Sequence, residues 1–293
     1  MGTNHCNVPS KFGYMNLAGG LSELGLPFDQ IGKGDPPTLH LSKMEFCDPA
    51  ATVALAAFAA STYRATKKSV TLEGWNPESY LARVGLKTLA GYKDDYPKRR
   101  QDTDRITNLI EVADSRDRQE ARKNVLNVLQ INHAGARSVL DYCLEEMLRN
   151  VDDHADSPVN ALLQAQYYEN RHEVVMAIAD TGSGILRSLQ QRHQTLDTDF
   201  DAVKAAMQPG VSGRNTKKGT NAGLGLTVSS RLVTRIGGTF QLVTGSAAME
   251  LTAKTEEIRS LRAPWRGVIV TMIVPRNDDL DWEGTFTEVM GEI

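Results

Sequence analysis

The sequence predicts a protein of the α/β class. Leu39–Phe46 alternates apolar and polar residues, which is typical of a half-buried strand. Leu140–His154 carries apolar residues at helical spacing, and Gly267–Pro275 is a nearly continuous apolar run that indicates a buried strand. The 293 residues are enough for one large domain or two ordinary ones. We therefore expect helices and strands to share at least one substantial core.

Composition indicates a folded protein whose net charge does not favour binding to charged partners. Hydrophobic residues make up 41% and the net charge is −3, so neither nucleic acid nor a membrane surface is an expected partner. Cys6, Cys47 and Cys143 show no CxxC spacing, which argues against disulfides or a zinc site. No stretch is apolar enough to span a bilayer and the start does not resemble a signal peptide, so we expect a cytoplasmic protein.

The first 92 residues are expected to form a tail and then a small domain. Residues 1–37 are rich in Gly, Pro and Asn without periodicity, so we expect a tail or a loosely packed arm. Residues 38–92 alternate strand and helix patterns, which predicts a small α/β unit. Its expected elements are a strand at Leu39–Phe46, a helix at Pro49–Tyr63 after the N-cap Asp48, a strand at Ser69–Glu73 and a helix at Glu78–Leu89.

Three further segments follow. Residues 93–115 are dense in charge and are expected to be a connector, although Ile106–Val112 has the pattern of one more strand. Residues 116–276 are expected to form the main domain, which opens with helical periodicity and a break near Asn132–Gly135. The acidic residues 277–293, with Trp282, are expected to be a tail or a docking segment.

The helix at Leu140–His154 carries a polar row apart from its apolar stripe. Glu146, Asn150 and Asp153 fall at i, i+4 and i+7, so their side chains share one face. An amide oxygen can ligate Mg²⁺, and a carboxylate one turn away can activate a water molecule. Glu146 is therefore the candidate catalytic base and Asn150 the candidate metal ligand. Glu145 lies off this row and is expected to face solvent or a partner.

Two glycine motifs follow this helix. Asp180-Thr181-Gly182-Ser183-Gly184-Ile185 comes after Glu173–Ala179, which has the pattern of a strand. Gly223-Leu224-Gly225-Leu226 runs into a helical pattern. Glycine lets a backbone approach a ligand closely, and a helix start offers free N–H groups to phosphate. An unpaired carboxylate at the end of a buried strand is costly, so we expect Asp180 to face a ligand.

The order and spacing of these motifs resemble the GHKL ATPase superfamily, which includes gyrase B, Hsp90, MutL, histidine kinases and anti-sigma-factor kinases. Glu146 and Asn150 match its N box, whose Glu activates water and whose Asn binds Mg²⁺. The other matches are Asp180, Gly182 and Gly184 in the DxGxG box, whose Asp recognises the adenine amino group, and Gly223 and Gly225 in the glycine box beside the phosphates. The resemblance covers about the C-terminal half. It implies a two-layer α/β sandwich, with a mixed sheet and helices on one face, that binds ATP and Mg²⁺.

The resemblance also marks residues around the motifs. Leu186–Ala222 corresponds to the ATP lid, with a short helix expected at Asp199–Met207 and a basic loop at Pro209–Gly219. Val268 stands where many relatives have a threonine that assists adenine recognition, so that contact is lost or moved. The remaining candidate nucleotide-binding residues are Asp153, His154, Ile185, Lys217, Lys218, Leu224 and Leu226.

The unit at 38–92 resembles the STAS-like domains found beside GHKL ATPases in bacteria. STAS domains of the anti-anti-sigma type carry a phosphorylatable serine just before the first helix. This chain has Cys47-Asp48-Pro49 there, with Thr52 as the nearest hydroxyl, and so departs from that phosphorylation pattern.

Three functions fit the pattern. We expect a slow ATPase in which Glu146 polarises water and ATP acts as a conformational switch that controls a protein partner. The alternatives are a Ser/Thr kinase of the anti-sigma type and a nucleotide-regulated module without turnover. A sensor histidine kinase is disfavoured because neither His133 nor His40 lies in a phospho-acceptor pattern. The sequence leaves open the identity of the protein partner and whether the chain forms a homodimer.

Overall fold

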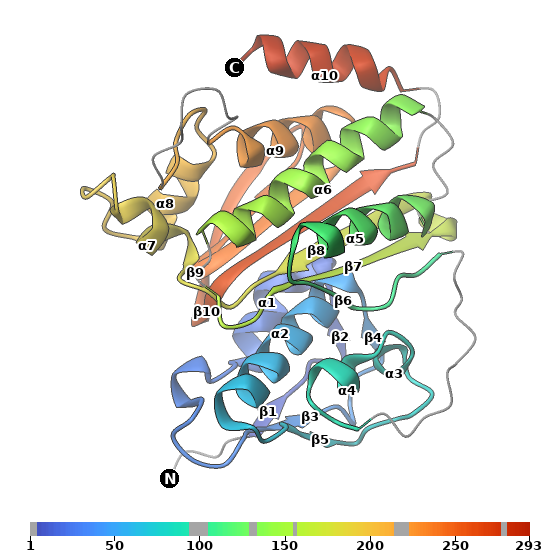
Figure 1. Cartoon of the computed structure of the whole chain (residues 1–293), viewed down its shortest axis with the longest axis vertical. Helices are drawn as coiled ribbons and strands as arrows, with labels where there is room; N and C mark the ends of the chain where they lie inside the picture. The colour runs from blue at the N-terminus through green and yellow to red at the C-terminus, as the bar shows by residue number, and fades with distance from the viewer. Residues whose placement is uncertain (1–4, 94–104, 129–133, 155–156, 214–222, 277–279) are drawn as a thin grey trace.

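An antiparallel sheet runs through the middle of the molecule, as Figure 1 shows. The computed structural model describes residues 5–93, 105–128, 134–154, 157–213, 223–276 and 280–293. The five strands pair in the order β6-β7-β8-β10-β9, and each pair is antiparallel. Their bounds are β6 Ile110–Val112, β7 Ala161–Tyr168, β8 Glu173–Ala179, β9 Thr239–Leu251 and β10 Glu256–Pro275.

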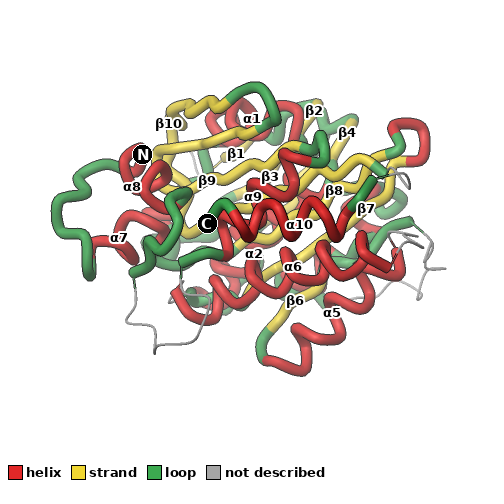
Figure 2. The backbone as a smooth tube through the Cα atoms, turned by 90° about the horizontal axis from the view of Figure 1, so that it is seen from above, coloured by secondary structure: helices red, strands yellow, loops and turns green. Residues whose placement is uncertain are grey.

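One face of the sheet carries a layer of helices. Apolar side chains of alternate strand residues, such as Ile178 and Val270, pack into one core with these helices. A further helix, α10, packs on the outside of α6 and α9, and Figure 2 shows it above this layer. The helices of this side are α5 Ser115–Val128, α6 Ala134–His154, α7 Gly184–Gln190, α8 Asp199–Ala206, α9 Gly225–Arg235 and α10 Trp282–Gly291.

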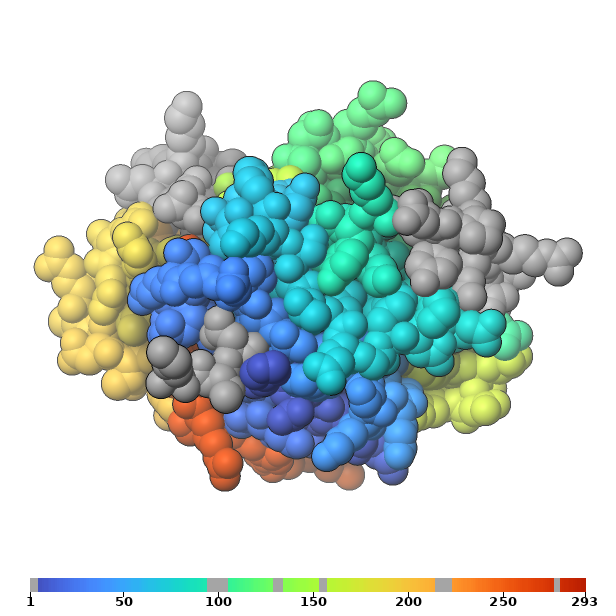
Figure 3. Space-filling view, turned by 90° about the horizontal axis from the view of Figure 1, so that it is seen from below, coloured from blue at the N-terminus to red at the C-terminus, as the bar shows by residue number. Residues whose placement is uncertain are grey.

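The N-terminal half covers the opposite face of the sheet. Figure 3, seen from below, shows its residues over much of that side of the molecule. Helix α2 packs against β7, β8 and β10, and α1 packs against β10. A parallel sheet β1-β3-β5 and a parallel pair β2-β4 lie around them. The elements of this half are β1 His5–Asn7, β2 Lys11–Phe12, α1 Leu17–Leu24, β3 Thr38–His40, β4 Phe46–Cys47, α2 Pro49–Thr66, β5 Thr71–Glu73, α3 Tyr80–Arg83 and α4 Leu86–Leu89. It also contains the 3₁₀ turns Tyr14–Asn16 and Phe28–Gln30, and a third 3₁₀ turn, Glu169–Arg171, joins β7 to β8.

Helix α2 is buried along most of its length because its sequence is rich in alanine. Its small side chains allow close approach to the strand residues Ala177, Ala179 and Ile269, which belong to the same apolar core. The buried carboxylate of Asp48 caps the helix by accepting hydrogen bonds from the backbone N–H groups of Ala50 and Ala51. The predicted helix and its N-cap are confirmed, and the helix extends beyond the expected end to Thr66.

Several expectations for the ends and the layers need correction. The expected N-terminal tail instead forms β1, β2 and α1, whose leucines are buried against the sheet. The expected C-terminal tail forms α10, because Trp282 is 2% exposed and Val289 is fully buried. The sheet is antiparallel where a mixed one was expected, and both of its faces are covered.

The unit expected at residues 38–92 also differs in detail. The strand predicted at Leu39–Phe46 is two short strands, β3 and β4. The helix predicted at Glu78–Leu89 is divided into α3 and α4 by Gly85, which has a φ of +86°. This unit shares one apolar core with the sheet through α2. In the described ranges, no helix is both long and apolar enough to cross a membrane.

Candidate functional site

A pocket opens between the helical layer and the ends of β8 and β10. Its empty volume is about 830 Å³, which includes space open to solvent. Apolar side chains such as Ile178, Val268 and Val270 line part of the wall. The predicted site residues that also line it are Asn150, Asp180, Gly184, Ile185, Gly223, Gly225 and Leu226. Residues from all three sequence motifs therefore meet at one cavity.

Helix α6 brings the predicted base and metal ligand to the pocket side. Its apolar stripe is buried as predicted, which fixes the rotation of the helix. Asn150 lies half-buried at the pocket wall. Glu146 lies one turn away and is 8% exposed, with Oε1 3.7 Å from Nη1 of Arg149. The carboxylate of Glu146 also lies against Gly225, where an added Cβ would stand 2.6 Å from Oε2.

Asp180 follows the last residue of β8 and turns its carboxylate to the pocket. The backbone N–H of Gly182 donates to Oδ1 at 2.7 Å, and Asp180 is 2% exposed. Burial raises the pKa of Asp180 to about 7, although backbone hydrogen bonds from Gly182 and Val268 oppose that rise. The pocket thus holds a buried carboxylate, and each carboxylate oxygen can accept more than one hydrogen bond.

The third motif forms the turn that starts α9. Gly223 has a φ of +77°, and a Cβ there would stand 2.6 Å from the carbonyl oxygen of Val211, so a side chain is strongly disfavoured. Helix α9 begins at Gly225 after Leu224, whose side chain makes no capping hydrogen bond. The first N–H groups of α9 are therefore available to an anion beside the pocket.

The other predicted residues have different outcomes. Gly182 supports Asp180 through its N–H group. Leu224 is partly buried and packs against the core between the sheet and the helical layer. Asp153 and His154 occupy the last turn of α6, and their side chains lie outside the described residues. Lys217 and Lys218 lie outside the described residues, together with much of the expected loop at Pro209–Gly219. The short helix expected within the lid is confirmed as α8.

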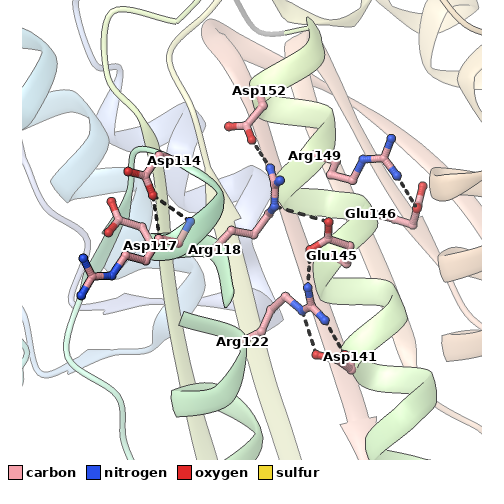
Figure 4. A network of polar contacts seen from close by, with 10 residues as sticks. Asp114, Asp117, Arg118, Arg122, Asp141, Glu145, Glu146, Arg149 and Asp152 are labelled. Atoms are coloured by element: carbon pink, nitrogen blue, oxygen red, sulfur yellow. Dashed lines mark hydrogen bonds and ion pairs between the residues drawn. The ribbon is translucent and has the colours of Figure 1, made fainter. Parts of the chain in front are cut away.

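Glu145 belongs to an ion-pair network between α5 and α6, which Figure 4 shows. Its carboxylate pairs with Arg118 at 3.4 Å and with Arg122, where a separate partner or solvent was expected. Arg122 also donates from Nε to Asp141 at 2.8 Å, and Arg118 pairs with Asp152. Sequence reasoning missed these partners because pairing between two helices leaves no local spacing signal.

The described residues fit a magnesium ion only together with a phosphate ligand. Among them, no group of three or more His, Cys, Asp or Glu side chains is arranged to hold a metal ion. The amide oxygen of Asn150 is a hard ligand at the pocket wall. Mg²⁺ is often held by one or two protein groups plus substrate phosphates, so Asn150 fits that role.

Comparison with known families gives a match for the C-terminal half. Residues 135–277 match the family described as histidine kinase-, DNA gyrase B-, and HSP90-like ATPase. The match begins in α6 and ends just beyond β10, so it contains all three motifs and the pocket. A comparison with curated proteins found no match for the chain. The matched residues do not include the N-terminal half, and the STAS-like resemblance is not confirmed.

Proposed function

We propose that this chain, whose residues 135–277 form a domain of the GHKL ATPase superfamily, hydrolyses ATP slowly and uses it as a conformational switch on a protein partner. The observation that carries the proposal is the meeting of Asn150, Asp180 and the Gly223–Leu226 turn at one pocket, with Glu146 one turn from Asn150. Each of these groups then acts on a different part of the nucleotide.

Asp180 recognises the adenine ring in this proposal. The N–H of Gly182 holds its carboxylate at Oδ1, and a remaining lone pair of the carboxylate accepts the hydrogen bond from the adenine amino group. Guanine has a carbonyl oxygen at that position and cannot donate. Val268 and Val270 offer apolar contact to the base, and the side chain at 268 supplies no hydroxyl. Adenine specificity therefore rests mainly on Asp180.

The phosphates meet the start of α9. The N–H groups at Gly225 and Leu226 suit an anion, and the Gly223 turn allows close approach. Asn150 is the protein ligand of the magnesium ion, which offsets phosphate charge when it is bound with ATP. Lys217 and Lys218 are proposed to add positive charge from the lid.

Glu146 is the proposed general base. Its ionised carboxylate accepts a proton from the attacking water while the start of α9 holds the phosphates beside it. In the kinase alternative, the same carboxylate takes the proton from a hydroxyl of a partner protein. The other residues of the proposed site have the same roles in both reactions.

Isothermal titration of the full-length chain tests nucleotide binding directly. We expect ATP to bind only with Mg²⁺, and Asn150→Ala to weaken that binding at least tenfold. Asn124→Ala is the matched control, because Asn124 is exposed on α5 and does not line the pocket. Equal affinity in wild type and Asn150→Ala would contradict the metal role of Asn150.

A second assay separates the three reactions. The chain is incubated with γ-labelled ATP, alone and with proteins captured from its host. Release of free phosphate by the chain alone supports the ATPase. Label transferred to a captured protein supports the kinase, and tight ATP binding without either product supports the module without turnover.

A further inference from the structure

Helix α2 contacts the turn formed by residues 180–185, called the adenine turn below, from the side opposite the pocket. The hydroxyl oxygens of Ser61 and Thr181 lie 2.6 Å apart, and the two residues are 3% and 0% exposed. Alternation along β8 continues past its end: Ala179 packs toward α2, Asp180 lines the pocket, and Thr181 faces α2 again. A single peptide bond therefore joins the residue held by α2 to the residue that faces the ligand.

The same end of α2 holds the segment that follows α6. Arg64, in the last turn of α2, donates to the carbonyl oxygen of Pro158 at 3.0 Å and pairs with Glu111. The backbone N–H of Thr181 donates to Ser157 Oγ at 3.1 Å. Hydrogen bonds thus connect α2 with the adenine turn and with the chain leaving the N-box helix.

Besides Ser61, the side chains that hold the adenine turn include Ser157, which accepts from the N–H of Thr181, and Thr244, whose Oγ1 accepts from the N–H of Ile185 at 3.1 Å. Gly182 and Gly184 follow Thr181, and neither has a side chain that could anchor the backbone. Helix α2 is by contrast well fixed: it is buried along most of its length, and its N-cap Asp48 also accepts from the N–H of Tyr14 at 2.7 Å. The rigid partner in this contact is therefore the helix.

We propose that Ser61 is a positioning residue for nucleotide recognition: its hydroxyl holds Thr181 and thereby sets the direction of the Asp180 carboxylate. The N-terminal half then tunes the ATP affinity of the C-terminal half, and any partner that shifts α2 changes that affinity. This inference rests on the proposed ATP-binding function and adds a route by which the N-terminal half controls it.

Four single variants of the full-length chain test the contact. Ser61→Ala and Thr181→Val each remove one hydroxyl of the pair, whereas Thr181→Ser keeps the hydroxyl and is the conservative rescue. Thr62→Val is the matched control, because Thr62 is buried on the same turn of α2 and, in the described part of the chain, its hydroxyl bonds only to the carbonyl oxygen of Phe58 in its own helix. Mg·ATP and Mg·GTP affinities are measured beside the melting temperature of each unliganded variant.

Ser61→Ala and Thr181→Val are expected to bind ATP roughly threefold to tenfold more weakly than wild type, as for loss of one buried hydrogen bond. Their preference for ATP over GTP should fall as well, because Asp180 is the main group that distinguishes the bases. The double variant Ser61→Ala/Thr181→Val should lose no more than either single variant. Thr181→Ser and Thr62→Val should stay within about twofold of wild type, even where melting temperature falls.

Two results would overturn the inference. One is ATP affinity and base preference within twofold of wild type in both Ser61→Ala and Thr181→Val. The other is an equal loss of ATP affinity in Thr62→Val, which would show that lower stability, and not the position of Thr181, weakens binding. A wild-type chain that does not bind ATP would instead refute the proposed function, and this inference with it.

Discussion

The Glu146 carboxylate lies against the backbone of Gly225, so close that an added Cβ would stand 2.6 Å from Oε2. Glu146 belongs to the first motif and Gly225 to the third. The contact therefore joins the helix that carries the proposed base to the helix start that faces the phosphates. A side chain at position 225 has to displace the carboxylate or separate α6 from α9.

Gly225→Ala is expected to destabilise the protein by about 1–3 kcal/mol through overpacking, and to lower the rate of ATP hydrolysis. In a Glu146→Ala background, most of that stability cost should disappear, because the carboxylate that occupies the space is gone. Denaturant unfolding of the four proteins in this cycle measures the coupling. An identical cost in both backgrounds would show that the two residues do not compete for space.

Asp180→Asn should damage adenine recognition specifically. It removes the charged acceptor for the adenine amino group, which is worth about 1.5–3 kcal/mol. Competition titrations should show a weaker ATP affinity and a GTP affinity close to that of wild type. A retained preference for ATP over GTP would remove Asp180 from the base-recognition site.

ATP affinity should rise with pH because adenine requires the ionised form of Asp180. Burial raises the pKa of this carboxyl to about 7, so near pH 6 most molecules must lose a proton to bind. Affinity should increase about tenfold between pH 6 and pH 8 and then level off. Asp180→Asn provides the control and should give a flat profile over that range, whereas a flat wild-type profile would contradict the linkage.

The same raised pKa predicts the opposite pH trend for the stability of the unliganded protein, whose unfolding free energy should fall as pH rises. The folded-state pKa of Asp180 lies above the ordinary value of 3.8, so its contribution to stability is fully present below about pH 4. That contribution is lost as pH rises through 7. Asp180→Asn should therefore flatten the pH dependence of the unfolding free energy between pH 4 and pH 7.

Trp282→Ala should destabilise the protein by about 3–5 kcal/mol, because the indole is buried where α10 packs on α6 and α9. Thr287→Ala is the control, since Thr287 is exposed on the same helix and its loss should cost no more than about 0.5 kcal/mol. Equal melting temperatures for both variants would show that α10 contributes little to the fold.

The features that sequence reasoning predicted well depend on local spacing. Asn150 lies four residues after Glu146 on one helix, and Asp180 directly follows a strand, so helical and strand periodicity alone set their directions. A pocket between the helix that carries Asn150 and the strand before Asp180 is also expected, because both segments carry apolar residues that must share a core. Local pattern was sufficient for these side chains.

The features that it missed depend on contacts between distant segments. Leu17, Leu21 and Leu24 are helically spaced, but glycines lie among them, and their burial depends largely on packing against β10, more than two hundred residues away. The hydrogen bond between Ser61 and Thr181 spans 120 positions. Pairing of this kind is set by the packing of α2 on the sheet, which no local pattern encodes.

Single-turnover hydrolysis of Mg·ATP by wild type and Glu146→Ala tests the central claim most directly. We predict that Glu146→Ala binds ATP normally and loses about 10²–10⁴-fold in rate, because the carboxylate acts on the nucleophile and not on the nucleotide. Glu145→Ala, which removes the neighbouring carboxylate that pairs with α5, should keep its activity. Hydrolysis by Glu146→Ala at the wild-type rate would contradict the account.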